Sequence, residues 1–365
     1  MFKAEELFQN ITDKNHPDET VLTIIQGKGT LPREQAGRNI HYDDASLSNY
    51  KKVEQGDFII HLRSFEGGLE MANEAGIVSP AYTILRCKRP HSSLFYDAYF
   101  HTDEFINHNL SKSVEGIRDG RQISYEAFKW LGIPYCEPTE QEKISNLFAA
   151  LNERIAKQRD LIEALKKYKR GLLSAVFSQN VSMFSTADFY AFSELAVRRS
   201  EKYDPKCNAH AVCIELEHIE QETGRIIGST CADYQNSIKT VCKPGDVMFG
   251  KLRPYLRKYA FVQKECVCSS EIWSLIPTDI VIPKYLFYLI QSEAFMKAAN
   301  VSSGTKMPRA EWSTIAKSGY PIPSKDDQQA TVDILETTDR IIVSHVASYD
   351  RLIEYKKGLL QRLFI

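Results

Sequence analysis

The chain has 365 residues and a mass of 41.7 kDa, which is too long for one ordinary domain and suits two or three. Hydrophobic residues at 43% and charged residues at 25% are ordinary values for a folded protein, so wholesale disorder is excluded. Lys and Arg number 46 against 47 Asp and Glu. Because no overall positive field exists, any polyanion must be bound by a local basic patch.

Nothing in the sequence indicates a membrane or an export pathway. No apolar run reaches the roughly 18 residues of a membrane span, and Glu5 and Glu6 stand where an export signal would be basic and then apolar. The eight cysteines are scattered and include no C-x-x-C pair, which is typical of reduced thiols rather than of disulfides or zinc sites. We therefore expect a cytoplasmic protein without membrane contact, metal ion or cofactor.

The first 133 residues predict a globule of mixed α and β structure. Apolar and β-branched residues follow Gly56 and Asp57, and a similar run covers Ile77–Leu85. Short runs of this kind between turn residues are typical of strands. A helix is expected over Tyr96–His108 and a loop over Glu115–Arg121.

Residues 134–178 predict one long helix. Their apolar residues recur in steps of four and three, interrupted at Gln158 and Lys169. A 3.5-residue apolar period makes a narrow stripe that is buried against another helix. The polar segment Ser178–Thr186 then predicts a joint to the rest of the chain.

A second globule, residues 186–320, repeats the order of the first more faintly. Gly245–Arg253 resembles Gly56–Arg63, with Gly-Asp and an apolar run in both. A second strand, a helix and a loop are expected in the same order over Val267–Leu275, Lys284–Ala299 and Ser303–Arg309. The two globules therefore predict one architecture used twice.

Residues 321–365 repeat the first helix. Pro134–Phe177 recurs as Pro321–Phe364 at an offset of 187 residues without a gap, and seven of ten identities fall in the last 13 positions, as L-x-x-Y-K-[RK]-G-L-L-x-x-x-F. Chance does not produce such a match. We predict that the two helices pair with each other as a coiled coil.

The best candidate for DNA binding is the segment Lys239–Lys258, which has six Lys and Arg against Asp246 alone. Arg253, Tyr255 and Arg257 alternate with apolar residues, so an extended segment would present basic and aromatic groups on one side. The plain alternative is a solvated strand edge. The predicted contact residues of this globule are Lys251, Arg253, Tyr255, Arg257, Lys258, Lys306 and Arg309.

The first globule lacks an equivalent cluster, because Arg63 stands near Glu66 and Glu70. Other basic residues must therefore supply its contacts to DNA. The candidates are Lys28, Arg33 and Arg38 near the glycine-rich segment, Arg63 itself, and Arg118 and Arg121 after Gly116.

No catalytic motif is present. Gly245–Lys251 has the spacing of a phosphate-binding loop, but Leu252 replaces the Ser or Thr that would hold magnesium and Pro254 obstructs the helix that should follow. No methyl-transfer signature of the Asn-Pro-Pro-Tyr type occurs. We expect a binding protein and name no catalytic residue.

The combination resembles a known family. Two divergent globules, each followed by a helix ending in K-[KR]-G-L-L-x-x-x-F, resemble a type I restriction–modification specificity subunit. The two Gly-Asp strands, the run Gly250–Leu256 and the Gly319–Pro323 segment are similar to that family's target-recognition domains. The resemblance implies two such domains, each reading half of a split DNA site, on an antiparallel helix pair that docks two methyltransferase subunits and, through the complex, restriction subunits.

The helices also carry more apolar residues than a two-helix seam requires. We expect a methyltransferase subunit to dock on each repeat. The candidate docking residues are Ile144, Leu147, Phe148, Leu151, Ile334 and Leu335.

The predicted architecture is α/β (α+β), in four segments: 1–133, target-recognition domain 1; 134–178, central helix; 186–320, target-recognition domain 2; 321–365, C-terminal helix. The predicted function is a non-catalytic specificity subunit that recognises a bipartite, asymmetric double-stranded DNA site. Two alternatives stay open: the DNA-recognition portion of a fused restriction–methylation enzyme, and a coiled-coil adaptor without DNA binding.

Overall fold

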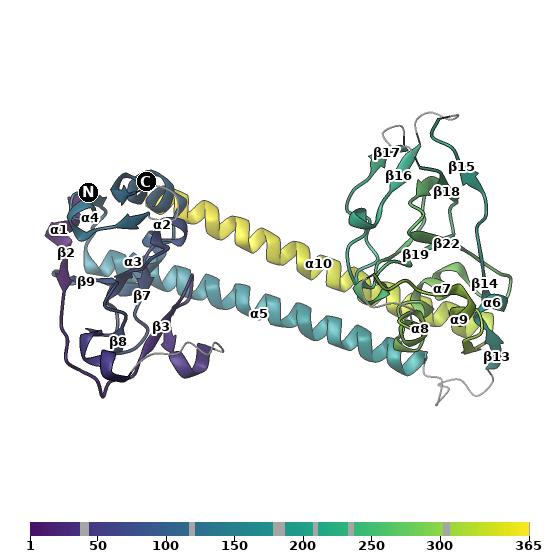
Figure 1. Ribbon diagram of the computed structural model, residues 1–365, viewed down its shortest axis with the longest axis horizontal. Helices are drawn as coiled ribbons and strands as arrows, with labels where there is room; N and C mark the ends of the chain where they lie inside the picture. Colours follow the sequence, from purple (N-terminus) through teal and green to yellow (C-terminus); the bar gives the residue numbers. More distant parts are fainter. Residues whose placement is uncertain are drawn as a thin grey trace. The chain divides into compact units, whose positions relative to one another are not determined.

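The computed structural model describes residues 1–36, 44–116, 121–177, 187–206, 211–232, 237–301 and 307–364. The chain divides into two compact units: unit 1 is Met1–Arg159 with Ala347–Ile365, and unit 2 is Asp160–Val346. Each unit holds one sheet-rich globule and parts of both long helices (Figure 1). The expected joint Ser178–Thr186 lies outside the described residues.

Globule 1, from β1 to β12, is built on a four-stranded sheet in the order β2-β9-β6-β7. Its strands are antiparallel neighbours, with Phe58 of β6 opposite Leu85 of β9. The strand predicted after Asp57 is confirmed, whereas the run Ile77–Leu85, predicted as one strand, forms parts of two strands with a turn between them. The elements are β1 (Phe2–Lys3), α1 (Ala4–Leu7), β2 (Phe8–Ile11), β3 (Leu22–Ile25), β4 (Gly29–Pro32), β5 (Lys51–Val53), β6 (Phe58–Ile60), α2 (Ser64–Gly67), β7 (Glu70–Met71), β8 (Gly76–Val78), β9 (Thr83–Cys87), α3 (Ser93–Phe100), β10 (Val114–Glu115), β11 (Gln122–Ile123), α4 (Tyr125–Phe128) and β12 (Gly132–Ile133).

Aromatic rings fill the core between this sheet and α3. Phe8 and Phe58 meet edge to face at 6.1 Å, and Phe100 of α3 lies 4.9 Å from Phe58 in the same arrangement. Tyr96 is fully buried beside them. Edge-to-face contacts add to the free energy gained from burying these large apolar surfaces.

Globule 2, from β13 to β23, has a matching four-stranded sheet in the order β14-β22-β19-β20 and a five-stranded sheet in the order β15-β18-β21-β16-β17. The strand predicted after Asp246 is confirmed, whereas the predicted strand over Val267–Leu275 is divided into two strands by a turn and the predicted helix over Lys284–Ala299 into two helices. Its elements are β13 (Asp188–Ala191), α6 (Phe192–Leu195), β14 (Ala196–Arg198), β15 (Lys202–Tyr203), β16 (Val212–Ile214), β17 (Thr230–Cys231), β18 (Lys239–Cys242), β19 (Val247–Gly250), β20 (Tyr259–Phe261), β21 (Cys266–Cys268), β22 (Ile272–Pro277), α7 (Pro283–Leu289), α8 (Glu293–Ala299), α9 (Trp312–Ile315) and β23 (Gly319–Ile322).

The two long helices have corresponding bounds. α5 spans Pro138–Val176 and α10 spans Lys325–Leu363, 39 residues each, so both ends keep the 187-residue offset. The helices pack together along their apolar stripes, which confirms the predicted pairing. In unit 2, Lys169 near the end of α5 bonds to Asp339 in the first half of α10 at 2.7 Å, as antiparallel helices require.

A buried glutamine joins the start of each helix to its own globule. The Gln141 Oε1 atom accepts the Ser92 N–H at 2.9 Å, and the Gln328 Oε1 atom accepts the Ile282 N–H at 2.8 Å. Ser92 and Ile282 are the residues that precede α3 and α7. Each glutamine therefore satisfies an N–H at the start of a globule helix, a group with no partner inside that helix.

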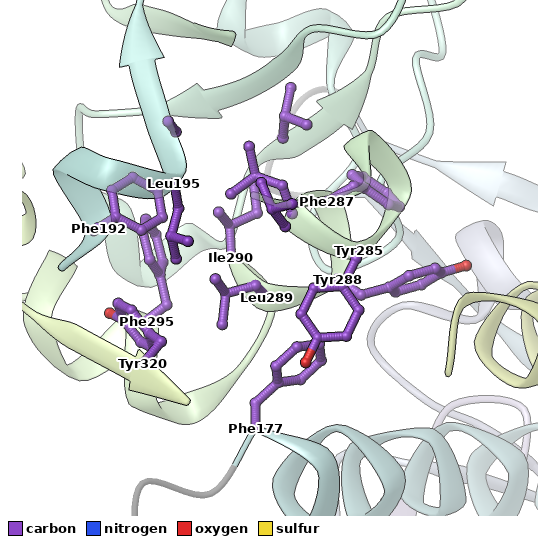
Figure 2. Packing of buried hydrophobic residues seen from close by; sticks show 14 of the residues in the cluster. Phe177, Phe192, Leu195, Tyr285, Phe287, Tyr288, Leu289, Ile290, Phe295 and Tyr320 are labelled. Atoms are coloured by element: carbon purple, nitrogen blue, oxygen red, sulfur yellow. The ribbon is translucent and has the colours of Figure 1, made fainter. Parts of the chain in front are cut away.

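A phenylalanine at the end of each helix completes the core of the unit in which it lies. In unit 1, the Phe364 ring lies 5.1 Å from Phe95 and 6.3 Å from Phe148. In unit 2, the centre of the Phe177 ring lies 5.1 Å from that of Tyr285, and Figure 2 shows both side chains in the core of globule 2. The start of one long helix and the end of the other therefore pack against each globule.

Candidate nucleic-acid interface

In globule 2 the chain leaves β19 through a tight turn. Arg253 and Arg257 have φ values of 51° and 49°, in the left-handed region, and flank a short 3-10 helix over Pro254–Leu256. Pro254 fixes its own φ and favours a turn over an extended strand. The predicted alternation along an extended segment is therefore wrong here. Arg253 and Tyr255 are nevertheless exposed.

Backbone bonds hold this turn against the segment after residue 306. The Arg253 N–H donates to Pro308 O at 2.7 Å, and the Ala310 N–H donates to Lys251 O at 2.8 Å. The Arg309 guanidinium binds both oxygens of Glu271, at 3.0 and 3.2 Å. The structure therefore brings Lys251, Arg253, Tyr255 and Arg309 together at the end of β19, while Lys306 lies outside the described residues.

Carboxylates elsewhere in the protein neutralise part of the positive charge of the Lys239–Lys258 segment. Lys239 is buried and its Nζ bonds to Glu215 at 2.7 Å, and Arg257 pairs with Glu293 at 2.6 Å. Lys258 donates to the Leu216 carbonyl at 2.6 Å. The cations best placed to meet a polyanion are the exposed Arg253 and the half-buried Lys251, because the other Lys and Arg side chains of the segment already have partners within the protein.

The equivalent edge of globule 1 follows β6, which has the place in its sheet that β19 has in globule 2. Arg63 is exposed there, and the Arg121 guanidinium lies 4.2 Å from the centre of the Phe65 ring. Arg118 and Arg38 lie outside the described residues. Arg33 lies 6.0 Å from the Tyr50 ring. In globule 1 the structure therefore brings Arg63 and Arg121 near each other after β6, at the edge equivalent to the end of β19 in globule 2.

Lys28 lies at the turn between β3 and β4, and this turn is bound by Glu70. Gly27 and Gly29 have φ values of 74° and 76°, and Lys28 between them is exposed. The Glu70 carboxylate is fully buried and accepts the Gly27 N–H at 2.6 Å and the Gly29 N–H at 2.9 Å. Sequence reasoning assigned Glu70 only a charge near Arg63.

His101 completes the surroundings of Glu70. Its Nε2 atom lies 3.3 Å from Glu70 Oε1, and its Nδ1 atom lies 2.8 Å from the Asp97 carbonyl oxygen. Burial opposes the charged forms, but the bond to His101 and the two glycine N–H groups hold the pKa of Glu70 below its ordinary value. Burial likewise works against a charged His101, and Glu70 and Asp97 outweigh it and raise the pKa of His101. Each of the two side chains therefore stabilises the charged form of the other.

The predicted docking residues divide into buried and exposed sets. Phe148, Leu151 and Leu335 are buried within the chain, so they are not open to a partner, and Ile144 is half-buried against the globule 1 core. Leu147 and Ile334, which correspond in the repeat, are 45% and 55% exposed. The open apolar surface is therefore narrower than the sequence suggested.

Sequence reasoning missed a second repeated surface near the helix ends. Tyr168 and Tyr355 correspond in the repeat and are 58% and 60% exposed. Three residues further on, Gly171 and Gly358 have open space where a Cβ would be. A shallow groove runs along the first copy, lined by Ala164, Lys167, Tyr168, Gly171 and Leu172. The shared Y-K-[RK]-G motif was the signal that could have found it.

Known proteins match this arrangement. Residues 201–352 match the family model of the type I restriction modification DNA specificity domain. The MjaVIII specificity subunit of Methanocaldococcus jannaschii is 20% identical over 339 residues, which cover 85% of this chain and 79% of that protein. The chain is therefore similar to the type I restriction–modification specificity subunits along most of its length. These matches support the role of a non-catalytic component of a restriction–modification complex.

Other relatives agree. The HindI specificity subunit of Haemophilus influenzae is 28% identical over 145 residues, 38% of this chain and 31% of its own length. The HsdS subunit from Thermoanaerobacter tengcongensis has the same fold, with a TM-score of 0.52 at 15% identity over 100% of this chain and 95% of that one. A chain of a type I restriction–modification system reaches a TM-score of 0.62 at 15% identity, over 99% and 96% of the two chains.

Within the described residues, no cluster of three or more His, Cys, Asp and Glu side chains is placed to hold a metal ion. Across the same residues, no helix is both long enough and apolar enough to span a bilayer.

Proposed function

We propose that the chain recognises a bipartite, asymmetric duplex sequence, with residues 1–133 reading one half-site and residues 186–320 the other. Residues 134–178 and 321–365 then form the connecting helices. The observation that carries this proposal is the contrast within the repeat: the helices share their bounds and motif, whereas the exposed loops after β6 and β19 differ. Loops free to diverge on a constant scaffold are what two independent DNA readers require.

The exposed basic residues at the two edges would supply both affinity and specificity. Lys and Arg contacts to phosphates give salt-dependent affinity, and Arg at a guanine edge gives specificity. In globule 2 these roles fall to Lys251, Arg253 and Arg309, with Tyr255 beside them. In globule 1 they fall to Lys28, Arg63 and Arg121.

The test is a domain exchange. Residues 1–133 are replaced by the corresponding domain of another specificity subunit, and methylated sites are mapped across the genome of cells that carry each version. One half-site should change and the other should stay. A change in both half-sites contradicts independent reading, and a chain that selects no DNA sequence supports the coiled-coil adaptor instead.

We infer that two methyltransferase subunits dock on the chain, one at each helix repeat, and that restriction subunits join through that complex. Support comes from apolar groups that are exposed twice at corresponding positions, Leu147 with Ile334 and Tyr168 with Tyr355. One kind of partner present in two copies explains a surface that occurs twice. The exposed cations Lys167, Arg170 and Lys357 beside it favour acidic side chains on the partner.

Gly171 and Gly358 support the proposal that a partner packs closely against these surfaces. Glycine in a helix interior costs about 1 kcal/mol relative to alanine, and nothing in either unit fills the space beside Gly171 or Gly358. We expect Gly171→Ala with Gly358→Ala to stabilise the chain by about 1 to 2 kcal/mol in total, while weakening a methyltransferase subunit's binding. Denaturant unfolding and co-purification measure the two effects.

Leu147→Asp with Ile334→Asp should likewise abolish co-purification while the chain stays folded. Ala149→Asp, at an exposed position on α5, is the matched control for added charge. Undiminished co-purification of the Leu147 and Ile334 variant would assign this surface to something other than the methyltransferase subunit.

A further inference from the structure

Hydrogen bonds within the protein hold the backbone of the turn around Lys28. The Lys28 N–H donates to the Ile25 carbonyl at 2.9 Å, and the Lys28 carbonyl accepts the Asn73 Nδ2 group at 2.7 Å. The same Nδ2 group donates to the Thr30 carbonyl at 2.9 Å. With Gly27 and Gly29 bound to Glu70, the N–H groups of residues 27–29 all have partners within the protein.

The use of a buried carboxylate here is unusual for an exposed turn. Removing a carboxylate from water is costly unless hydrogen bonds replace its hydration. Glu70 meets that requirement with two N–H groups that solvent could have satisfied equally well at a surface turn. The arrangement resembles an anion-binding nest of backbone N–H groups, filled by the protein's own side chain.

Glycine is required at position 29 for two separate reasons. Its φ of 76° is a conformation that other residues seldom adopt, and an added Cβ would lie 2.5 Å from the Met71 carbonyl oxygen. The turn is therefore packed against the β7 end of the sheet. A single conformation of residues 27–29 follows.

The Lys28 side chain is open to solvent. It is exposed, and no hydrogen bond or ion pair involves its Nζ within the described part of the chain. Across the fold, Gly67 of α2 lies against Gln26, so the turn adjoins the segment that begins at Arg63. Lys28 thus stands on the same edge as the other candidate DNA contacts of globule 1.

We propose that Lys28 is a specificity-determining residue of globule 1 and that Glu70 is the positioning residue that fixes the backbone from which the Lys28 side chain extends. This inference rests on the proposed function. A phosphate contact tolerates a flexible lysine, whereas a base edge in the major groove demands a fixed origin for the side chain. A lysine so held selects an acceptor-rich edge, which in duplex DNA is the O6 and N7 pair of guanine.

The experiment selects binding sites from random duplexes with the full-length chain in the complex with which it purifies. The parent defines two half-sites. Lys28→Ala should relax one or two base positions of one half-site, with a loss of discrimination of about 5- to 150-fold, and leave the other half-site unchanged. Lys112→Ala, which removes another exposed lysine of globule 1, should change neither.

Glu70 is tested by a graded series. Glu70→Ala should relax the same base positions as Lys28→Ala, and Glu70→Gln, which keeps one acceptor for the glycine N–H groups, should restore part of the preference. Glu74→Gln removes an exposed charge four residues away and is the control. Combining Lys28→Ala with Glu70→Ala should add no further loss of discrimination.

Three outcomes overturn the inference. Both half-sites stay sharp in Lys28→Ala, or Lys28→Ala lowers affinity evenly for all sequences with a smaller salt dependence, as a phosphate contact would. In the third, Glu70→Ala relaxes positions that Lys28→Ala leaves sharp. If the parent itself selects no bipartite site, the proposed function fails instead, so the two failures are distinguishable.

Discussion

The two globules share their scaffold and differ at their exposed edge. Both contain a four-stranded sheet with the same strand order. Each globule also binds a glutamine from the start of one long helix and a phenylalanine from the end of the other. At the edge, globule 1 presents a lysine between two glycines, and globule 2 presents an arginine in a left-handed turn bound to a distant segment. Core packing constrains the sequence of the scaffold, whereas the ligand constrains the sequence of the exposed edge.

A buried aspartate shows how far the scaffold tolerates sequence change. Asp57 and Asp246 each end the turn before the central strand, and each binds an arginine through two bonds of 2.6 to 2.8 Å. The arginine is Arg86 of β9 in globule 1 but Arg199, just after β14, in globule 2. The two globules share an arginine that neutralises the buried carboxylate, but a different strand supplies it in each.

The largest effects are expected at the helix ends. Phe364→Ala should destabilise unit 1 and Phe177→Ala unit 2, each by about 3 to 5 kcal/mol, because each truncation leaves a cavity in an aromatic core. Amide hydrogen exchange of the full chain measures both. Loss of protection should be confined to globule 1 in the first variant and to globule 2 in the second. Equal loss in both globules would mean that the two units do not unfold separately.

A smaller effect separates the two aspartates. Arg199 is 14% exposed and has Glu201 at 3.7 Å as a second partner, and Asp246 also accepts the Ser274 hydroxyl. Arg86 is 30% exposed and has a closer second partner, Glu54 at 3.1 Å. Asp246→Ala should therefore cost about 3 kcal/mol and Asp57→Ala about 2 kcal/mol, since an unpaired arginine is worse where water is scarce. Denaturant unfolding measures both, and the reverse order would show that Glu54 contributes nothing.

The smallest expected effect is one of pH and belongs to globule 1 alone. The pKa of His101 is raised above its usual value near 6.5, so its contribution to stability is full below about pH 6.5 and is lost as pH rises through the raised value. The pKa of Glu70 is lowered from 4.5, so its contribution is full above that pH and is lost as pH falls through the lowered value. Both contributions are complete between about pH 4.5 and 6.5.

The measurement is the difference in unfolding free energy between the parent and His101→Gln across this range. Other groups face the pair: Asp97 and His61 act on His101 directly, and Lys356 of α10 acts on Asp97. Because these groups are common to both proteins, much of their titration cancels in the difference. A difference that grows above pH 6.5 would contradict the assigned sign.

The sequence alone predicted the repeated parts of the fold accurately. The 187-residue offset placed both helices, and turn residues around short apolar runs placed the strands. Contacts between distant residues were out of reach. Glu215, Glu201 and Glu293 neutralise the Lys239–Lys258 segment from remote positions, and Phe148 is covered by Phe364, so neither the true charge nor the exposed face follows from local spacing.

The position of Phe364 has a consequence for biosynthesis. Its ring packs on Phe95 and Tyr99, residues that the ribosome makes roughly 270 codons earlier. The core of globule 1 is thus completed only after globule 2 and most of α10 have been made, whereas Phe177 is already made when globule 2 emerges. A nascent chain therefore carries an unfinished aromatic surface until Phe364 is added, which makes globule 1 the part that needs protection from aggregation.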